Sequence, residues 1–338
     1  MRPEENKSTL KHFADRVCAA VHAKGSPVVV GLDPRPEGLP PGLLSDCRGK
    51  FGDSPLAYAA AFWSFNRGII DAVHDVVPAV KPQLAFYERY GIAGLMAYAR
   101  TTAYAREAGL LVVADGKRND IGSTADAYAE AFLRVPEALE QPADGESGYF
   151  DYFHDFVHFG ADALTVNPYL GHDGVDPFIN WADRHGRGVF VLVRTSNRSA
   201  ADVQDLWVGK QPLYERIGEL VKQWGERSRG HSGYSCVGAV VGATWPQQAA
   251  RLREIMPNTL FLVPGYGAQG ATAADVACCF DAADRGALVN ASRSIIFAWR
   301  SKPCAERNPE TKYGEAARQA AQRMTEDIHI AQRQFFGA

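Results

Sequence analysis

The chain has 338 residues, of which 46% are hydrophobic, and its 36 basic against 39 acidic residues give a formal net charge of −3. This balance is typical of a globular protein and excludes a protein-wide basic field for nucleic acid or a membrane surface, so any phosphate binding must be local. No apolar run is long enough to span a membrane, and the N-terminus lacks a signal-peptide core. We therefore expect a cytoplasmic protein with neither nucleic-acid nor membrane partners.

Eight short apolar runs, with helix-like segments between them, recur along the chain. They are residues 26–33, 78–84, 109–117, 161–169, 188–196, 236–244, 260–267 and 287–295. Near-continuous apolar character is typical of parallel strands that helices cover on the outside. The helix-like segments include residues 56–75, 91–109 and 246–256.

Eight strands alternating with helices favour a (β/α)₈ TIM barrel of the α/β class. We expect a single domain over residues 1–338, with the barrel core at about 26–300. A doubly wound open sheet is the structural alternative.

Two connections are long for a barrel. Residues 134–158 hold the polar stretch "QPADGESG" and are expected to form a flexible insertion. Residues 197–211 follow the fifth expected strand, so they leave the C-terminal mouth of the barrel and are a candidate lid.

The six cysteines show no CxxC spacing, which favours reduced thiols over disulfides or a redox pair. Adjacent Cys278 and Cys279 are expected on a buried helix face. The other four are Cys18, Cys47, Cys236 and Cys304.

Polar residues stand at the C-terminal ends of the expected strands, where the chemistry of such barrels gathers. They are Asp33, Lys81, Asp115, Lys117, Asn167, Thr195, Ser196, Thr244, Gln269 and Arg293. Two lysines and two carboxylates within this set predict a clustered charged site at the mouth.

The stretch "VVADGKRNDIGST" ends an apolar strand on several charges. Strand alternation puts Asp115 and Lys117 on one face, which we expect to point into the barrel. Asp120 follows three residues later and can turn back or reach a neighbouring subunit. Alternatively, Asp120 or Ser123 could cap a helix that starts near Thr124.

A lysine between two carboxylates is held protonated by their charge. A substrate carboxylate brought against the same aspartates would be destabilised by repulsion. Its departure as neutral CO₂ would relieve that repulsion, and the ammonium would protonate the carbon left behind. Two sources of the rate acceleration are compatible with these residues: destabilisation of the bound substrate, and stabilisation of the carbanion that forms.

A phosphate site is predicted near the end of the chain. "PGYGAQG", residues 264–270, is a glycine-rich turn that leads into an expected helix, and Arg293 follows the eighth strand. Backbone N–H groups, a helix N-terminus and a guanidinium all suit an anion at the usual phosphate position of these barrels.

The segment "DGKRNDIGST" resembles the D-x-K-x-x-D-I-x-x-T motif of the orotidine 5′-phosphate decarboxylase family, which makes UMP from orotidine 5′-phosphate (OMP). Further segments follow in the family's order: "VGLDPRP", "VKPQLAFYERYG", "TVNPYLGHDG", "VLVRTSN", "VGAVVGATWP", "FLVPGYGAQG" and "NASRSI". In detail the chain is similar to the longer bacterial subgroup, type 2.

The resemblance implies a homodimeric barrel with active sites shared at the interface and with no cofactor or metal. Lys81, Asp115, Lys117 and Asp120 would form the family's charged network, with Lys117 as the proton donor to C6 of the substrate. The last aspartate would enter the site of the other subunit.

The resemblance also implies the substrate contacts. Asp33 would contact the ribose, Ser196 the pyrimidine ring, and Gln269 with Arg293 the 5′-phosphate. The full set is Asp33, Thr124, Ile121, Ser196, Gly265, Gly267, Gln269 and Arg293. Ile121 and Thr124 would act with Asp120 across the interface, and the glycine turn would close over the phosphate.

Two other functions are compatible with parts of this pattern. A Mg²⁺-dependent sugar-phosphate enzyme of the same superfamily, such as hexulose-phosphate synthase, shares D-x-K-x-x-D, but Lys81 and "RTSN" favour the pyrimidine substrate. A non-catalytic phosphate-binding barrel would have no need of the complete charged network.

Overall fold

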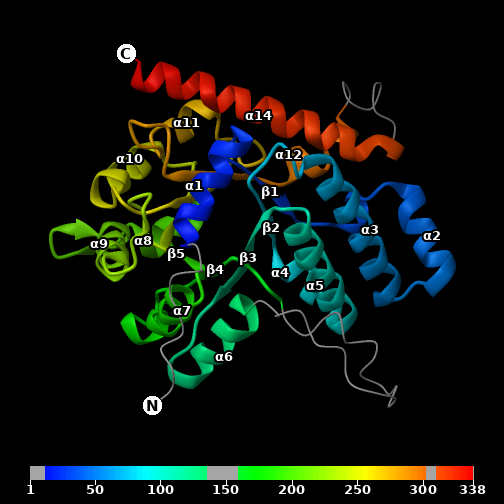
Figure 1. Cartoon of the computed structure of the whole chain (residues 1–338), viewed down its shortest axis with the longest axis horizontal. Coiled ribbons are helices and arrows are strands. Elements are labelled where there is room, and N and C mark those ends of the chain that lie inside the picture. The colour runs from blue at the N-terminus through cyan, green and yellow to red at the C-terminus, as the bar shows by residue number, and fades with distance from the viewer. Residues whose placement is uncertain (1–11, 135–158, 302–309, 338) are drawn as a thin grey trace.

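A computed structural model of the chain describes residues 12–134, 159–301 and 310–337. Within these ranges eight parallel strands close into a barrel in the order β1, β10, β9, β8, β5, β4, β3, β2 (Figure 1). The strands are Val28–Leu32 (β1), Ala79–Pro82 (β2), Leu111–Arg118 (β3), Ala163–Val166 (β4), Gly188–Arg194 (β5), Val237–Val241 (β8), Phe261–Pro264 (β9) and Ala287–Ala291 (β10). The predicted (β/α)₈ barrel is confirmed, and the open sheet was wrong.

Each of the eight apolar runs corresponds to one barrel strand, and only β3 extends past its run, by one residue to Arg118. Every residue of β1, β2, β4, β8 and β10 is buried. Burial on both sides explains why these strands read as continuous apolar runs rather than as alternating ones.

Helices surround the barrel on the outside (Figure 1). The three helix-like segments correspond to Pro55–Val73 (α3), Gly91–Glu107 (α5) and Pro246–Ile255 (α10). The others are Phe13–Lys24 (α1), Pro41–Phe51 (α2), Leu84–Glu88 (α4), Gly122–Leu133 (α6), His172–Arg184 (α7), Ala201–Gln204 (α8), Leu213–Gly225 (α9), Ala273–Ala277 (α11), Arg293–Ile296 (α12) and Tyr313–Phe336 (α14). Short 3₁₀ turns lie at Pro36–Gly38, Arg198–Ala200, Ala298–Arg300 and Glu310–Lys312.

Helix α1 packs against the start of β5, at the N-terminal end of the barrel. The ring of Phe13 is fully buried and meets Phe190 edge to face, with centroids 6.0 Å apart. A Cβ at Gly188 would lie only 2.2 Å from the Phe13 ring, so β5 must begin with glycine for α1 to seat there. The opposite end of the barrel is left free for a site.

Helix α14 runs along one side of the molecule and packs against α3, α11 and α12 (Figure 1). Tyr313 stacks on Phe65 of α3 with ring centroids 5.0 Å apart. Arg318 forms a bidentate ion pair with Asp75, which follows α3. The C-terminal segment is thereby fixed to the same side of the barrel that carries β1.

The expected lid segment has its own secondary structure. After β5 the chain forms a 3₁₀ turn, the short helix α8, and a hairpin of Trp207–Val208 (β6) with Gln211–Pro212 (β7). Residues 197–211 are therefore structured rather than an open loop. The other long connection was expected at 134–158, and all of it after residue 134 lies outside the described residues.

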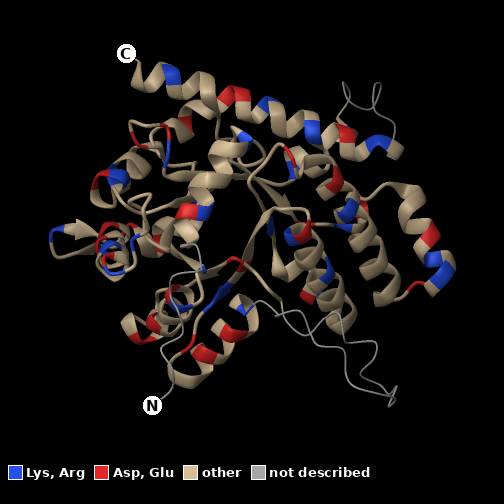
Figure 2. Cartoon of the chain, viewed as in Figure 1, with Lys and Arg blue, Asp and Glu red and all other residues tan. Residues whose placement is uncertain are grey.

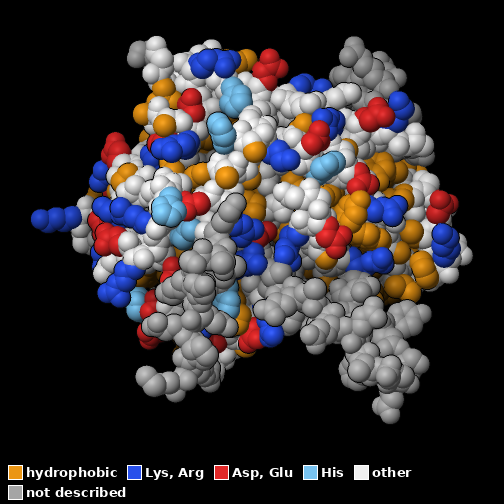
Figure 3. Space-filling model, in the orientation of Figure 1, with side chains coloured by type: hydrophobic (Ala, Val, Ile, Leu, Met, Phe, Trp, Pro, Cys, Tyr) orange, Lys and Arg blue, Asp and Glu red, His pale blue; other side chains and the backbone are white. Residues whose placement is uncertain are grey.

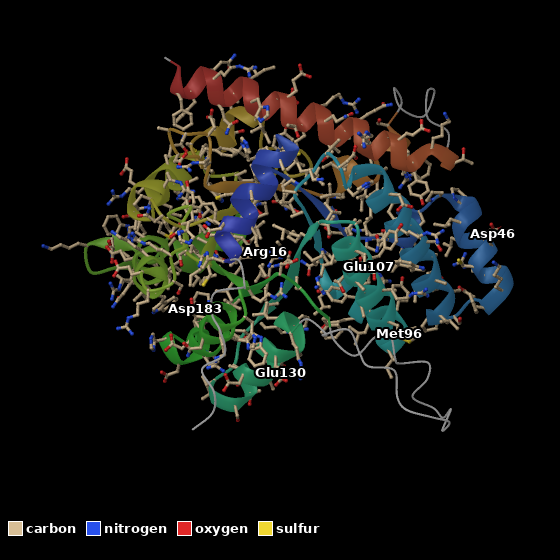
Figure 4. All side chains as sticks on the ribbon, in the orientation of Figure 1. Arg16, Asp46, Met96, Glu107, Glu130 and Asp183 are labelled. Carbon is tan, nitrogen blue, oxygen red and sulfur yellow. The ribbon has the colours of Figure 1, made fainter. Side chains whose placement is uncertain are left out.

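Charged side chains of both signs are interspersed over the outer helices (Figure 2), and no large single-sign field covers the face seen in Figure 3. Asp46, Glu130 and Asp183 mark this periphery on α2, α6 and α7 (Figure 4). None of the helices in the described ranges has the length and apolar character needed to cross a membrane.

Five of the six cysteines lie in the described ranges, and all five are free thiols. Cys278 and Cys279 are buried as expected, but they follow the last residue of α11 instead of forming a helix face. Cys304 lies outside the described residues.

Candidate active site

A cavity of about 520 Å³ opens at the C-terminal ends of the barrel strands. Nine of the predicted residues line it: Asp33, Lys81, Asp115, Lys117, Thr195, Ser196, Gly265, Gln269 and Arg293. They come from strands or strand ends all around the barrel, so closure of the sheet brings together residues up to 260 positions apart in the chain.

Asp115 is the centre of the charged cluster. Its Oδ2 atom accepts from Lys81 Nζ at 2.7 Å, and its Oδ1 atom accepts from Lys117 Nζ at 2.6 Å. The side chains of Lys81 and Asp115 are 5% and 10% exposed, whereas that of Lys117 is 46% exposed. Lys81 is thus a buried counter-charge, and Lys117 is the ammonium that a ligand in the cavity can reach.

Two neutral side chains complete the hydrogen bonds of this carboxylate. Gln83 Nε2 donates to Asp115 Oδ2 at 3.0 Å, and Thr165 Oγ1 donates to Asp115 Oδ1 at 3.0 Å. Sequence reasoning missed both residues. The available signal for Gln83 was its place two residues after Lys81, on the same side of the strand path. Thr165 carried only the weak signal of a single polar residue within an apolar strand.

The charges of the cluster stabilise one another. Burial by itself would raise the pKa of Asp115, but Lys81 and Lys117 outweigh that effect and hold the pKa well below its usual range. Burial opposes the charge on Lys81, yet Asp115 and Asp33 raise the pKa of Lys81 above its usual value. The carboxylate of Asp115 and the ammonium of Lys81 are therefore both charged at neutral pH.

The backbone departs from a regular strand where β3 reaches the mouth. Lys117 has φ +47°, and the pairing of β3 with β4 shifts register between Ala114 and Arg118. Asp115 and Lys117 do lie side by side in the cavity, as predicted. Both residues belong to β3, but the backbone at Lys117 is not that of a regular strand, so alternation alone does not account for its direction.

Three buried oxygen atoms in the cavity wall have no hydrogen-bond partner within the described part of the chain. They are Asp33 Oδ1, Asn290 Oδ1 and Ser292 Oγ, from the ends of the neighbouring strands β1 and β10. Buried polar atoms are normally hydrogen-bonded. This wall therefore suits a ligand that carries hydroxyl groups.

The glycine-rich turn after β9 needs glycine for its backbone shape. Gly265, Gly267 and Gly270 have φ values of +110°, +70° and +96°, which residues with a side chain rarely adopt. The N–H of Gly267 donates to the carbonyl of Ala271 at 2.8 Å, which closes the turn. Gly265 lines the cavity, and Gly267 does not.

Arg293 is exposed and lines the cavity beside this turn, where its Nη2 atom donates to the carbonyl of Ala268 at 3.2 Å. The helix after the turn contributes less to anion binding than expected. Helix α11 has five residues, and Thr272 and Asp275 form a capping box at its N-terminus. The helix end is already occupied by a carboxylate, which leaves Arg293 and the turn as the groups that face an anion.

Ser196 lines the cavity, and its carbonyl accepts a hydrogen bond from Thr244 Oγ1 at 3.1 Å. Thr244 therefore supports Ser196 and does not itself reach the cavity lining. Asn167 also points elsewhere, since its Oδ1 atom accepts from the N–H of Tyr169 at 3.0 Å. Two members of the strand-end set are thus structural.

Asp120, Ile121 and Thr124 do not line the cavity of their own chain. Helix α6 begins at Gly122 and its N-cap position has no side-chain hydrogen bond, so the alternative that Asp120 or Ser123 caps this helix was wrong. Asp120 Oδ1 accepts instead from the N–H of Ile121 at 2.9 Å. The Ile121 side chain is 55% exposed.

Within the described ranges, no three His, Cys, Asp or Glu side chains gather closely enough to hold a metal ion. The cavity instead presents ammonium groups, the guanidinium groups of Arg35 and Arg293, amides and hydroxyls around the single buried carboxylate of Asp115 and the half-buried Asp33.

Comparison with known proteins assigns the chain to a family. The model of the "Orotidine 5′-phosphate decarboxylase / HUMPS family" matches residues 26–306. The chain belongs to this family. An orotidine 5′-phosphate decarboxylase of Rhodopirellula baltica is 44% identical over 316 residues, which cover 94% of this chain and 98% of that relative.

Other members of the decarboxylase family agree. The orotidine 5′-phosphate decarboxylase of Caldicellulosiruptor bescii is 40% identical over 290 residues, covering 86% of this chain and 91% of the relative. Among solved structures, the OMP decarboxylase of Leishmania donovani has a TM-score of 0.67 and 30% identity, covering 95% of this chain and 98% of that one. The resemblance drawn from the motifs is confirmed at the level of the family.

Proposed function

We propose that this protein converts OMP to UMP and CO₂, the last step of de novo UMP synthesis, as a carboxy-lyase. The observation that carries the proposal is the Lys81–Asp115–Lys117 cluster in a cavity that also holds Arg293. Membership of the decarboxylase family supports the same substrate.

The cavity offers a partner for each part of OMP. Arg293 and Gln269, beside the glycine-rich turn, bind the 5′-phosphate through a guanidinium and an amide. Asp33 accepts from the ribose hydroxyls with the oxygen that lacks a partner in the described part of the chain. Ser196 hydrogen-bonds the pyrimidine ring. These contacts orient the substrate carboxylate toward Asp115 and Lys117.

In the proposed reaction the bond between C6 and the carboxylate carbon breaks, and its electron pair stays on C6 while CO₂ leaves. Lys117 then gives a proton to C6 and recovers one from solvent. Two unit charges 4 Å apart interact by about 4 kcal/mol at an effective dielectric constant near 20. Repulsion between Asp115 and the substrate carboxylate favours loss of that carboxylate as neutral CO₂. Attraction between the Lys117 ammonium and the negative charge that develops on C6 favours the same step.

We propose that the reaction needs no cofactor and no metal, because the ammonium of Lys117 supplies the proton that the product requires. Asp115 keeps that ammonium in place through a 2.6 Å ion pair. The proton donor and the group that orients it thus both belong to the chain.

We also propose a homodimer with shared sites. Asp120, Ile121 and Thr124 carry the family's motif but lie outside the cavity of their own chain, around an exposed apolar side chain. In a dimer they would complete the charged network of the partner's site. Asp120 would then act as the fourth charged member of each network.

The test is an assay in which the purified protein is given OMP, with and without EDTA. The loss of orotate absorbance monitors the reaction. We expect UMP formation that EDTA does not reduce. Lys117→Ala should lower kcat by at least about 100-fold, as loss of a general acid does. Lys222→Ala, an exposed lysine on α9, is the matched control.

Absence of UMP formation by the wild-type protein would overturn the proposed activity. Loss of UMP formation on adding EDTA would contradict the metal-free reaction. Wild-type turnover by Lys117→Ala would contradict the assignment of the proton donor alone.

A further inference from the structure

Lys117 adopts a backbone conformation that is unfavourable for a residue with a side chain. Its φ of +47° lies in the left-handed region, and within the described residues only Asp284 shares this property among non-glycines. Such conformations persist where surrounding contacts hold them, and they gather at functional sites.

A buried hydroxyl holds the backbone at Lys117, in addition to the ion pair between the Lys117 side chain and Asp115. The backbone N–H of Lys117 donates to Thr165 Oγ1 at 2.9 Å. Thr165 lies on β4, is 1% exposed, and stands where the pairing of β3 with β4 shifts register. The hydroxyl thus accepts the N–H that the irregular turn withdraws from the regular ladder.

The same hydroxyl also orients the carboxylate. Thr165 Oγ1 donates to Asp115 Oδ1 at 3.0 Å, and this is the oxygen that accepts from Lys117 Nζ at 2.6 Å. An amide N–H can only donate and an ionised carboxylate can only accept, so the hydroxyl must accept from one and donate to the other. The hydrogen of the Thr165 hydroxyl therefore points toward Asp115.

We propose that Thr165 is a positioning residue for the reaction: its hydroxyl holds the Lys117 turn and the Asp115 carboxylate together, so that the Lys117 ammonium points into the cavity. This inference rests on the proposed function, in which Lys117 is the proton donor. Thr165 exchanges no proton with the substrate. It acts only through Asp115 and Lys117.

Two substitutions separate the hydroxyl from the shape of the side chain. Thr165→Val keeps the β-branched shape and removes both hydrogen bonds, whereas Thr165→Ser keeps the hydroxyl and removes a methyl group. Thr102→Val is the matched control. Thr102 is also buried at 1% exposure, and its hydroxyl bonds only to the carbonyl of Ala99 within α5, outside the cavity lining.

The first measurement is the kinetics of OMP decarboxylation. We expect Thr165→Val to lower kcat by about 100-fold, the effect of displacing a reacting group by about 1 Å. Its KM should stay within about three-fold of wild type, because the residues proposed to bind phosphate and ribose are unchanged. Thr165→Ser and Thr102→Val should keep kcat within about three-fold.

The second measurement does not depend on activity. Hydrogen exchange of the Lys117 amide, followed by NMR, should be slow in the wild-type protein and in Thr165→Ser. In Thr165→Val the same amide should exchange at least about ten-fold faster, because its acceptor is gone. Thr102→Val should leave the exchange of Lys117 unchanged.

These two readouts distinguish failure of the inference from failure of the proposed function. Unchanged kcat and unchanged Lys117 exchange in Thr165→Val would overturn the inference, as would equal losses of kcat in Thr165→Ser and Thr165→Val. A change confined to KM would also overturn it, since that indicates direct substrate contact. If the wild-type protein does not act on OMP, faster Lys117 exchange in Thr165→Val alone still supports the positioning role, and unchanged exchange refutes it.

Discussion

One carboxylate organises the charges of the cavity. The two oxygens of Asp115 accept four hydrogen bonds, two from ammonium groups and two from the neutral side chains of Gln83 and Thr165. A buried charge is tolerated when its partners satisfy it in this way. Conversely, each partner needs Asp115 to satisfy its own hydrogen-bonding group. Lys81 needs this partner most, because the Lys81 ammonium is almost completely buried.

Replacing Asp115 by Asn should therefore destabilise the fold as well as the activity. Asp115→Asn leaves the Lys81 ammonium buried without its ion pair, and we expect the free energy of unfolding at pH 7 to fall by about 3 kcal/mol. Asp53→Asn is the control, since Asp53 is 71% exposed beside Arg48 and should change stability by less than about 0.5 kcal/mol. Urea unfolding measures both, and equal effects would contradict the account of the buried pair.

At the scale of elements, an ion pair joins helix α14 to the end of α3. The hydrogen bonds from Arg318 lower the pKa of Asp75 to about 2, against the opposing effect of burial. A carboxyl whose pKa is lower in the folded state stabilises the fold above its unfolded pKa. That stabilisation is lost as pH falls toward the folded pKa.

Asp75→Asn should therefore have an effect that depends on pH. At pH 7 we expect a loss of up to about 1 kcal/mol in the free energy of unfolding, since both side chains are partly exposed and screened by water. The difference from wild type should shrink between about pH 4 and pH 2, where Asp75 becomes protonated in both states. Asp46→Asn, on the exposed face of α2, should show no such pH dependence in thermal unfolding followed by circular dichroism.

At the scale of the whole molecule, the family motif divides between two locations. Asp115 and Lys117 face the cavity of their own chain, while Asp120, Ile121 and Thr124 lie outside it. The proposed dimer accounts for this division because the second group would serve the partner's cavity. A symmetric dimer would then contain two such composite sites.

Mixing two inactive variants tests the composite site. Lys117→Ala and Asp120→Ala chains, dissociated together and reassembled, should regain OMP decarboxylation. In a heterodimer one site lacks both groups and the other has both, so random mixing should restore about a quarter of the wild-type sites. Lys117→Ala reassembled alone is the control. Heterodimers that form without recovering activity would argue against a shared site.

Much of this protein could be predicted from its residues in chain order. Eight buried strands are visible because parallel strands covered on both sides must be apolar throughout. The charged residues of the motif are visible because charges seldom end a buried strand without a partner. The glycines after β9 are recognisable because their backbone angles exclude other residues.

The hydrogen bonds of Asp115 could not be predicted in the same way. Gln83, just after β2, and Thr165, on β4, meet this carboxylate from 32 and 50 residues away along the chain. Local patterns in the sequence determined which residues are buried and which are charged, because these properties depend mainly on each residue and its near neighbours in the chain. Only the closed barrel decided that Thr165 would bond the left-handed backbone at Lys117, because this acceptor comes from a neighbouring strand that is distant in sequence.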